Sequence, residues 1–185
     1  MVNQIFTHTN LFPNDKIPAP AVYETRLTVK GIILDEFNRI AMVSTKGSGR
    51  YFLPGGGIEE GEFPEIALKR EAMEEVGCDI KIIKKFASTE EYRDRTGELY
   101  KTECFLARVS KDEEDAQFIP EDSLFGPDNI WVPRAEAVDL LNKQIKEKPN
   151  EIPASSAGRP ECYYNRKFTT TRDLFFVTKS KDAQF

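Results

Sequence analysis

The chain has 185 residues, the size of one compact domain with an added segment. Its 39% hydrophobic and 31% charged residues are close to the average of globular proteins, which excludes collagen-like and disordered classes. The 31 acidic and 26 basic residues give a net charge of −5, so no overall positive field draws the chain to nucleic acid or anionic lipid. We therefore expect neither a nucleic-acid nor a membrane partner.

The start of the chain lacks the apolar stretch of a secretory signal, and its apolar runs are far shorter than the ~20 residues of a membrane span. We expect a cytoplasmic protein. Three cysteines, Cys78, Cys104 and Cys162, are spaced neither as a disulfide framework nor as a zinc ribbon. His8 is the single histidine, which excludes zinc sites of the HExxH kind because they need two. Any chemistry must then use carboxylates, lysine, arginine or a bound metal.

The N-terminal part of the chain combines an irregular segment with a predicted hairpin. Residues 1–24 contain three prolines and read as an arm with a short strand at 4–6. A β-branched run from residue 25 predicts a strand to Ile33, and a turn at 35–38 leads to a return strand at 40–43.

A glycine-rich loop separates a short predicted strand from a helix. The strand at 51–53 leads into Pro54 and three glycines, 55–57. A strand that ends in such a loop before a helix is a common phosphate-binding arrangement. Pro64 suits the first helical position and Gly77 the C-cap, so we predict a helix over 64–76.

Strands and one further helix are expected in the rest of the chain. In chain order we predict strands at 80–86 and 103–109, a polar loop at 90–97, a charged turn at 111–115, a strand at 130–133, a helix at 135–146, a loop at 147–165 and a strand at 174–177.

Three glutamates share one face of the predicted helix 64–76. At about 100° per residue, Glu71, Glu74 and Glu75 fall within one narrow arc beside the apolar stripe. Like charges at these spacings destabilise a helix, and a divalent cation would compensate them. Oxygen ligands with no nearby histidine or cysteine suit Mg²⁺ or Mn²⁺, and Mg²⁺ commonly joins carboxylates to substrate phosphates. A solvated face balanced by Lys69 and Arg70 is the alternative.

The segment from Gly56 to Cys78 decides between these alternatives, because it resembles the signature of the Nudix hydrolase family. That signature is G-x5-E-x7-R-E-U-x-E-E-x-G-U, where U is a bulky aliphatic residue. Both U positions hold smaller residues, Ala72 and Cys78. The residues before and after it, 53–56 and 131–133, also resemble the family, so the similarity covers about 25–145. All seven fixed positions match: Gly56, Glu62, Arg70, Glu71, Glu74, Glu75 and Gly77.

The resemblance implies an α/β fold of the Nudix type. This is an α/β/α sandwich with a curved mixed sheet, the signature helix on one side and the helix 135–146 on the other. With this resemblance, we expect an N-terminal arm at 1–24, a Nudix hydrolase domain at 25–145 and a C-terminal extension at 146–185 packed on the same domain.

The resemblance also implies hydrolysis of a nucleoside diphosphate linked to another group, with Mg²⁺ or Mn²⁺ as cofactor. Carried over by position, Glu71, Glu75 and the Gly56 carbonyl would hold the metal. Glu74 would act as the catalytic base or bind a second ion, and Arg70 would orient the carboxylates. Glu62 would support the turn between loop and helix from outside the metal site.

The base and the substrate stay open at this point. A base in the loop 90–97 is the alternative to Glu74. A (deoxy)nucleoside triphosphate is the first substrate hypothesis, and ADP-ribose, dinucleoside polyphosphates and nucleotide sugars are the alternatives. Four residues are candidate substrate contacts: Arg26, Arg50, Tyr51 and Arg93.

Two further hypotheses come from other classes of protein. One is a non-catalytic module that senses nucleotides. The other is an isoprenoid diphosphate isomerase, which would need Cys104 or Cys162 in the pocket. The sequence is also compatible with a homodimer.

Overall fold

The computed structural model describes residues 3–45, 48–110, 128–147 and 160–182. The elements in chain order are β1 (Gln4–Thr7), α1 (His8–Leu11), β2 (Glu24–Leu34), β3 (Ile40–Met42), α2 (Pro64–Val76), β4 (Ile80–Arg93), β5 (Glu98–Val109), β6 (Ile130–Val132), α3 (Arg134–Lys146), α4 (Pro160–Lys179) and the short 3₁₀ helix Ser180–Asp182.

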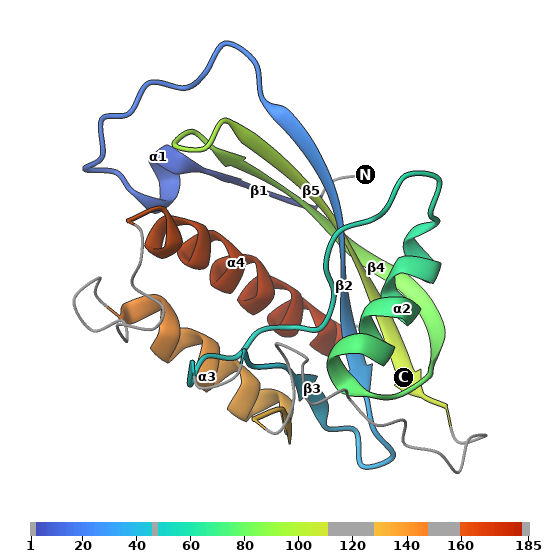
Figure 1. The fold of residues 1–185 in the computed structure, drawn as a ribbon. Coiled ribbons are helices and arrows are strands. Elements are labelled where there is room, and N and C mark those ends of the chain that lie inside the picture. The colour runs from blue at the N-terminus through green and yellow to red at the C-terminus, as the bar shows by residue number, and fades with distance from the viewer. Residues whose placement is uncertain (1–2, 46–47, 111–127, 148–159, 183–185) are drawn as a thin grey trace.

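The described strands form one mixed sheet of six, in the order β1-β4-β5-β2-β3-β6. The pairs β2/β5 and β1/β4 are parallel, and the other pairs are antiparallel. Helix α2 lies on one face of the sheet, and α3 and α4 lie on the other (Figure 1). The sandwich of helices around a mixed sheet that the sequence predicts is therefore confirmed.

Alternation along β2 supplies both halves of the core. Ile32 and Leu34 face the layer of α3 and α4, whereas Val29 and Ile33 face α2. Gly31 lies directly under α2, where an added Cβ would come within 2.9 Å of a Leu68 methyl group. Because a strand buried on both faces reads as a nearly continuous apolar run, β2 is recognisable in the sequence.

The N-terminal segment joins this sheet and packs on α4. The predicted short strand is confirmed as β1, which adds a parallel edge strand to β4. Phe6, Phe12 and Phe168 then form an aromatic cluster between this segment and α4. Lys167 Nζ on α4 also donates to the backbone carbonyl of Leu11, at 2.8 Å.

The predicted polar loop at 90–97 is wrong over its first half. Strand β4 continues to Arg93 and β5 begins at Glu98, which leaves a turn of four residues with Gly97 at φ 68°. The end of β4 cannot be recognised from apolar residues, because the buried position is occupied by Glu91. Arginines balance the charge of Glu91 inside the protein. The segment 51–53 makes only one bridge, between Val43 and Phe52.

The C-terminal predictions also need correction. Residues 160–165, expected in a loop, begin helix α4, and the expected strand 174–177 is its last part. The run Leu174 to Val177 suggests a strand because both faces of that helical turn are at least partly buried. The remaining part of the predicted loop, 148–159, and the charged turn 111–115 lie outside the described residues. The helices α2 and α3 confirm the predicted ones to within one residue.

No helix in the described part of the chain is long and apolar enough to cross a membrane.

Replacing Phe176 by alanine tests whether α4 is an integral part of the core. Phe176 is 0% exposed and packs in the cluster of Ile32 and Leu141, so Phe176→Ala should lower the free energy of unfolding by about 3–5 kcal/mol. Phe37→Ala is the matched control, because Phe37 is 69% exposed. Chemical denaturation with unchanged m-value gives the comparison, and equal effects of both variants would contradict the packing of α4.

Candidate active site

The glycine loop, Pro54–Gly57, runs along the edge of β2 that β3 leaves open. Gly31 N donates to the Pro54 carbonyl at 3.0 Å, and Val29 N donates to the Gly56 carbonyl at 2.9 Å. Gly55 has φ 123°, and an added Cβ would lie 2.3 Å from the Val29 carbonyl oxygen. Only glycine fits that approach, so the loop is held against the sheet by its backbone.

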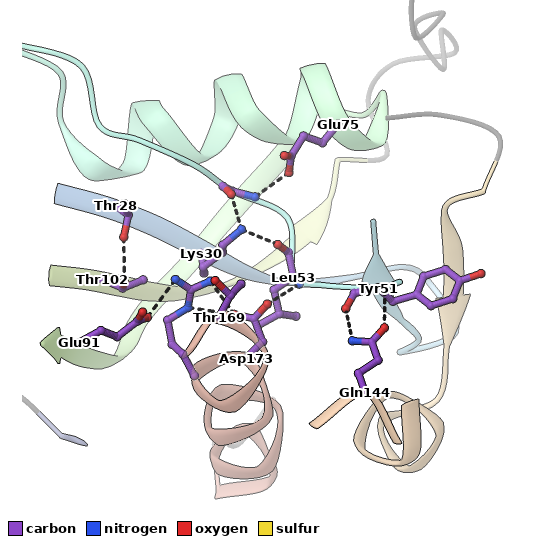
Figure 2. Close-up of polar contacts among 12 residues, drawn as sticks. Thr28, Lys30, Tyr51, Leu53, Glu75, Glu91, Thr102, Gln144, Thr169 and Asp173 are labelled. Carbon is purple, nitrogen blue, oxygen red and sulfur yellow. Dashed lines mark hydrogen bonds and ion pairs between the residues drawn. The ribbon is translucent and has the colours of Figure 1, made fainter. Parts of the chain in front are cut away.

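Lys30 on β2 fixes the position of this loop. Its side chain is almost fully buried, and its ammonium group donates to the Leu53 carbonyl at 2.8 Å and to the Gly55 carbonyl (Figure 2). Burial lowers the pKa of Lys30, and the nearby carboxylates of Asp173 and Glu75 oppose that shift. The sequence analysis missed Lys30, although a lysine inside the apolar run of β2 is the signal that it needs a buried partner.

Glu75 of the signature lies on the other side of the loop. Its side chain is buried, and Oε2 accepts a hydrogen bond of 2.7 Å from Gly55 N. Burial raises the pKa of Glu75 to about 7, against the opposing effects of Lys30 and the Gly55 amide. Lys30 and the Gly55 amide therefore do not fully offset the cost of burying a negative charge on Glu75.

Arg70 connects the remaining acidic residues of the signature. Its guanidinium donates to both carboxylate oxygens of Glu62 at 3.1 Å, to Glu71 Oε1 at 2.8 Å and to the Gly57 carbonyl at 3.0 Å. Glu74 lies 3.5 Å away. The hydrogen bond from Arg70 lowers the pKa of Glu62. Arg70 thus supplies part of the charge that compensates the carboxylates, as the alternative of a face balanced by Lys69 and Arg70 predicts for this residue.

The atoms around the loop that could be metal ligands are carboxylate and carbonyl oxygens. The backbone of Gly56 touches Glu71, because an added Cβ would lie 2.5 Å from Glu71 Oε1. The Gly56 carbonyl already accepts from Val29, but a carbonyl oxygen has a second lone pair. The side chain of Glu74 is 57% exposed. Within the described residues, no three acidic, histidine or cysteine side chains form a preassembled metal centre.

These residues nevertheless fit a hard divalent cation better than any other group. Glu71 and Glu75 both contact the glycine loop, at Gly56 and Gly55, and burial raises the pKa of Glu75. Carboxylate and carbonyl oxygens are the ligands that Mg²⁺ and Mn²⁺ prefer.

A pocket of about 330 Å³ opens beside Glu75, between the glycine loop and α4. We call it the Glu75 pocket. Its described lining residues are Lys30, Thr45, Ser48, Arg50, Phe52, Gly55, Glu75, Gln144, Asn165, Arg166, Thr169 and Thr170.

Of the four predicted substrate contacts, only Arg50 lines the Glu75 pocket. Tyr51 packs against the core, and Gln144 bonds both its backbone N–H and its carbonyl. Arg26 is exposed and paired with Glu24 and Glu98. Arg93, the fourth, is buried outside the pocket lining, with its guanidinium over the ring of Tyr100 at 3.8 Å. Binding roles for these residues stay predictions, and Arg50, the one that lines the pocket, is paired there with Glu147.

A buried charge network links α4 to β4 and to the glycine loop. Glu91 on β4 accepts from Arg93 at 3.0 Å and from Arg172 at 3.1 Å. Burial alone would raise the pKa of Glu91, but the two arginines hold it below its ordinary value. Arg172 also bonds Asp173, whose other oxygen accepts from Leu53 N at 3.0 Å (Figure 2).

The carboxylates of the loop 90–97 that were considered as an alternative base are engaged elsewhere. Glu91 is fully buried in the network, Asp94 accepts from Tyr23 at 2.7 Å, and Glu90 accepts from Tyr92 at 3.0 Å. None of these residues is among the described lining of the Glu75 pocket.

The family model of the NUDIX domain matches residues 24–153. The chain belongs to the Nudix family. The signature helix and glycine loop lie within that match, whereas β1, α1 and α4 lie outside it. Both of these outer segments pack on the same sheet or its layers.

Solved structures agree with this assignment at the level of the fold. A Nudix hydrolase from Nitrosomonas europaea is 17% identical with a TM-score of 0.53, over 84% of this chain and 91% of that one. A UDP-X diphosphatase is 19% identical with a TM-score of 0.52, over 88% of this chain and 66% of that one. A search of curated protein sequences finds no match.

Replacing Lys30 by methionine tests the clamp on the glycine loop. Lys30→Met leaves the Leu53 and Gly55 carbonyls without their donor, so we expect a loss of about 1–3 kcal/mol in the free energy of unfolding. Lys81→Met on β4 is the control, because Lys81 is exposed and such surface changes stay within about 0.5 kcal/mol. Denaturation curves measure both variants. A Lys30→Met protein as stable as the control would contradict the clamp.

Proposed function

We propose that this Nudix hydrolase cleaves the diphosphate linkage of a nucleoside diphosphate joined to another group, with Mg²⁺ or Mn²⁺ as cofactor. A (deoxy)nucleoside triphosphate is the first substrate to test, and ADP-ribose, dinucleoside polyphosphates and nucleotide sugars follow. One observation carries the proposal: Glu75 accepts a hydrogen bond from Gly55, both residues line the Glu75 pocket, and Glu71 contacts the glycine loop at Gly56. We further propose a cytoplasmic location.

The residues have separate roles in the proposed reaction. Glu71, Glu75 and the Gly56 carbonyl hold the divalent cation, and Arg70 keeps Glu71 against the loop through its 2.8 Å ion pair. When bound, the cation neutralises phosphate oxygens and the leaving group. Water attacks phosphorus, its proton passes to a base, and the bond from phosphorus to the bridging oxygen breaks.

We assign the role of base to Glu74. Its side chain is the most exposed of the three helix carboxylates, and Arg70 lies at 3.5 Å, so it is accessible to water and substrate. Glu90 and Asp94 are less suited because their carboxylates already accept hydrogen bonds from tyrosines.

The alternatives from other classes are less well supported. An isomerase that uses Cys104 would need its thiol in the pocket, but Cys104 is fully buried in the core. Burial also raises the pKa of the Cys104 thiol well above its ordinary value, which disfavours the reactive thiolate. A non-catalytic sensor would bind nucleotides without turnover, so the activity of the unmodified protein distinguishes it.

Replacing Glu75 by glutamine tests the proposed metal ligand. The amide oxygen of Glu75→Gln keeps an acceptor for Gly55 N, so the loop should stay in place. Loss of the charge should lower the rate of Mg²⁺-dependent hydrolysis by more than ~100-fold. The same variant should lose the rise in melting temperature that Mg²⁺ gives the unmodified protein.

Glu65→Gln is the matched control on the same helix, because Glu65 is exposed and lies away from the loop. It should keep the full rate and the thermal shift. Hydrolysis by the Glu75→Gln variant within threefold of the unmodified protein would refute the assignment of Glu75.

A further inference from the structure

Four residues of α4 form one wall of the Glu75 pocket. Asn165 and Thr169 are four residues apart, as are Arg166 and Thr170, so these residues lie on one side of the helix. The glycine loop and Glu75 line the same pocket. Helix α4 lies outside the residues that the family model matches.

The strongest polar groups of the pocket are already bound within the protein. Lys30 donates to two backbone carbonyls, and Arg50 pairs with Glu147. Gln144 uses both its amide N–H and its oxygen on the backbone of Tyr51. These groups fix the shape of the pocket rather than its ligand.

Three neutral side chains of the lining are not engaged in this way. Within the described residues, the side chains of Thr45, Asn165 and Thr170 hydrogen-bond to no other residue. Thr170 is only 6% exposed. None of their polar atoms is among the buried ones of the described chain that lack a partner, so water reaches these side chains from the pocket. A ligand that donates and accepts hydrogen bonds would satisfy these groups.

Neutral hydroxyl and amide groups match the hydroxyl groups of a sugar. Each of them both donates and accepts, as a sugar hydroxyl does. A phosphate would instead require cations that are free to bind it, but Lys30, Arg50 and Arg166 of the lining each already interact within the protein. A nucleobase favours stacking between aromatic rings, and Phe52 alone is aromatic among the described lining residues.

We propose that Asn165 and Thr170 of α4 bind the hydroxyl groups of a sugar ring of the substrate. The inference rests on the proposed function, because it places the diphosphate at the glycine loop and the sugar on the opposite wall. The sugar is either the ribose of the nucleoside or a sugar linked to its diphosphate.

Equilibrium binding of three probes tests this wall. We would titrate UTP, dUTP and UDP-glucose by calorimetry in EDTA, with the unmodified protein, Thr170→Val and Asn165→Leu. Both substitutions nearly preserve volume and remove the polar group. Each should raise the Kd of a sugar-bound probe by about three- to tenfold, as loss of one hydrogen bond does.

The probes distinguish the two sources of the sugar. If the wall binds ribose, Thr170→Val weakens UTP and UDP-glucose, and dUTP is affected less because its 2′-hydroxyl is missing. If the wall binds a linked sugar, only UDP-glucose is weakened.

Thr171→Val is the matched control, because the neighbouring threonine lines a different cavity with Phe6 and Leu174. It should leave every Kd unchanged. The inference is overturned if Thr170→Val and Asn165→Leu leave all three Kd values unchanged, if Thr171→Val has an equal effect, or if the unmodified protein binds no probe. Binding of UDP-glucose without Mg²⁺-dependent hydrolysis of any nucleotide would overturn the proposed function and leave this inference intact.

Discussion

The ammonium group of Lys30 is the contact on which the geometry of the site depends. It holds the carbonyls of Leu53 and Gly55 from inside the sheet, while Gly55 N donates to Glu75. A lysine buried at this depth is unfavourable by itself, because its charge leaves water. The two carbonyls and the nearby carboxylates of Glu75 and Asp173 offset that cost. The loop, the helix and the sheet therefore share one buried group of charges.

Helix α4 holds Leu53, the residue just before the glycine loop. Asp173 accepts from Leu53 N, and the Leu53 carbonyl accepts from Lys30, so both polar groups of one peptide residue are held by side chains. Asp173 is in turn joined through Arg172 to Glu91 on β4. Breaking a buried network of this kind at one member leaves an unpaired charge, which costs far more than a surface ion pair. The segment after the family match is thus tied to the loop of the signature.

The sequence predicts the local parts of this structure well. The bounds of α2 follow from Pro64 and from Gly77, which adopts a left-handed conformation at φ 76°. Strand β2 follows from its β-branched and aliphatic residues, and β3 from a continuous apolar run. These features depend on neighbours within a few residues, which is the range over which sequence patterns are informative.

The parts that depend on distant partners are missed. Glu91 and Arg93 look like loop residues until Arg172, about 80 positions later, balances them inside the protein. The same holds for Lys30, whose acceptors are on the glycine loop. Sequence reasoning finds the carboxylates of the signature because their spacing is that of a helix. It cannot find the wall of α4, since spacing along one helix does not indicate which surface lies opposite.

In this site, the charged residues of the signature and the neutral residues of the α4 wall lie on different helices. Motif residues that carry net charge, Glu71, Glu74, Glu75 and Arg70, lie along one helix at the glycine loop. Helix α4 contributes the neutral side chains of Asn165, Thr169 and Thr170 together with one cation, Arg166. Under the proposed function, the charged groups would act on the diphosphate that all candidate substrates share, and the neutral hydrogen-bonding groups would distinguish what is attached to it. Because these neutral groups lie on α4 and not on the signature helix, they can change without altering the charged residues, provided that Asp173 keeps its hydrogen bond from Leu53 N.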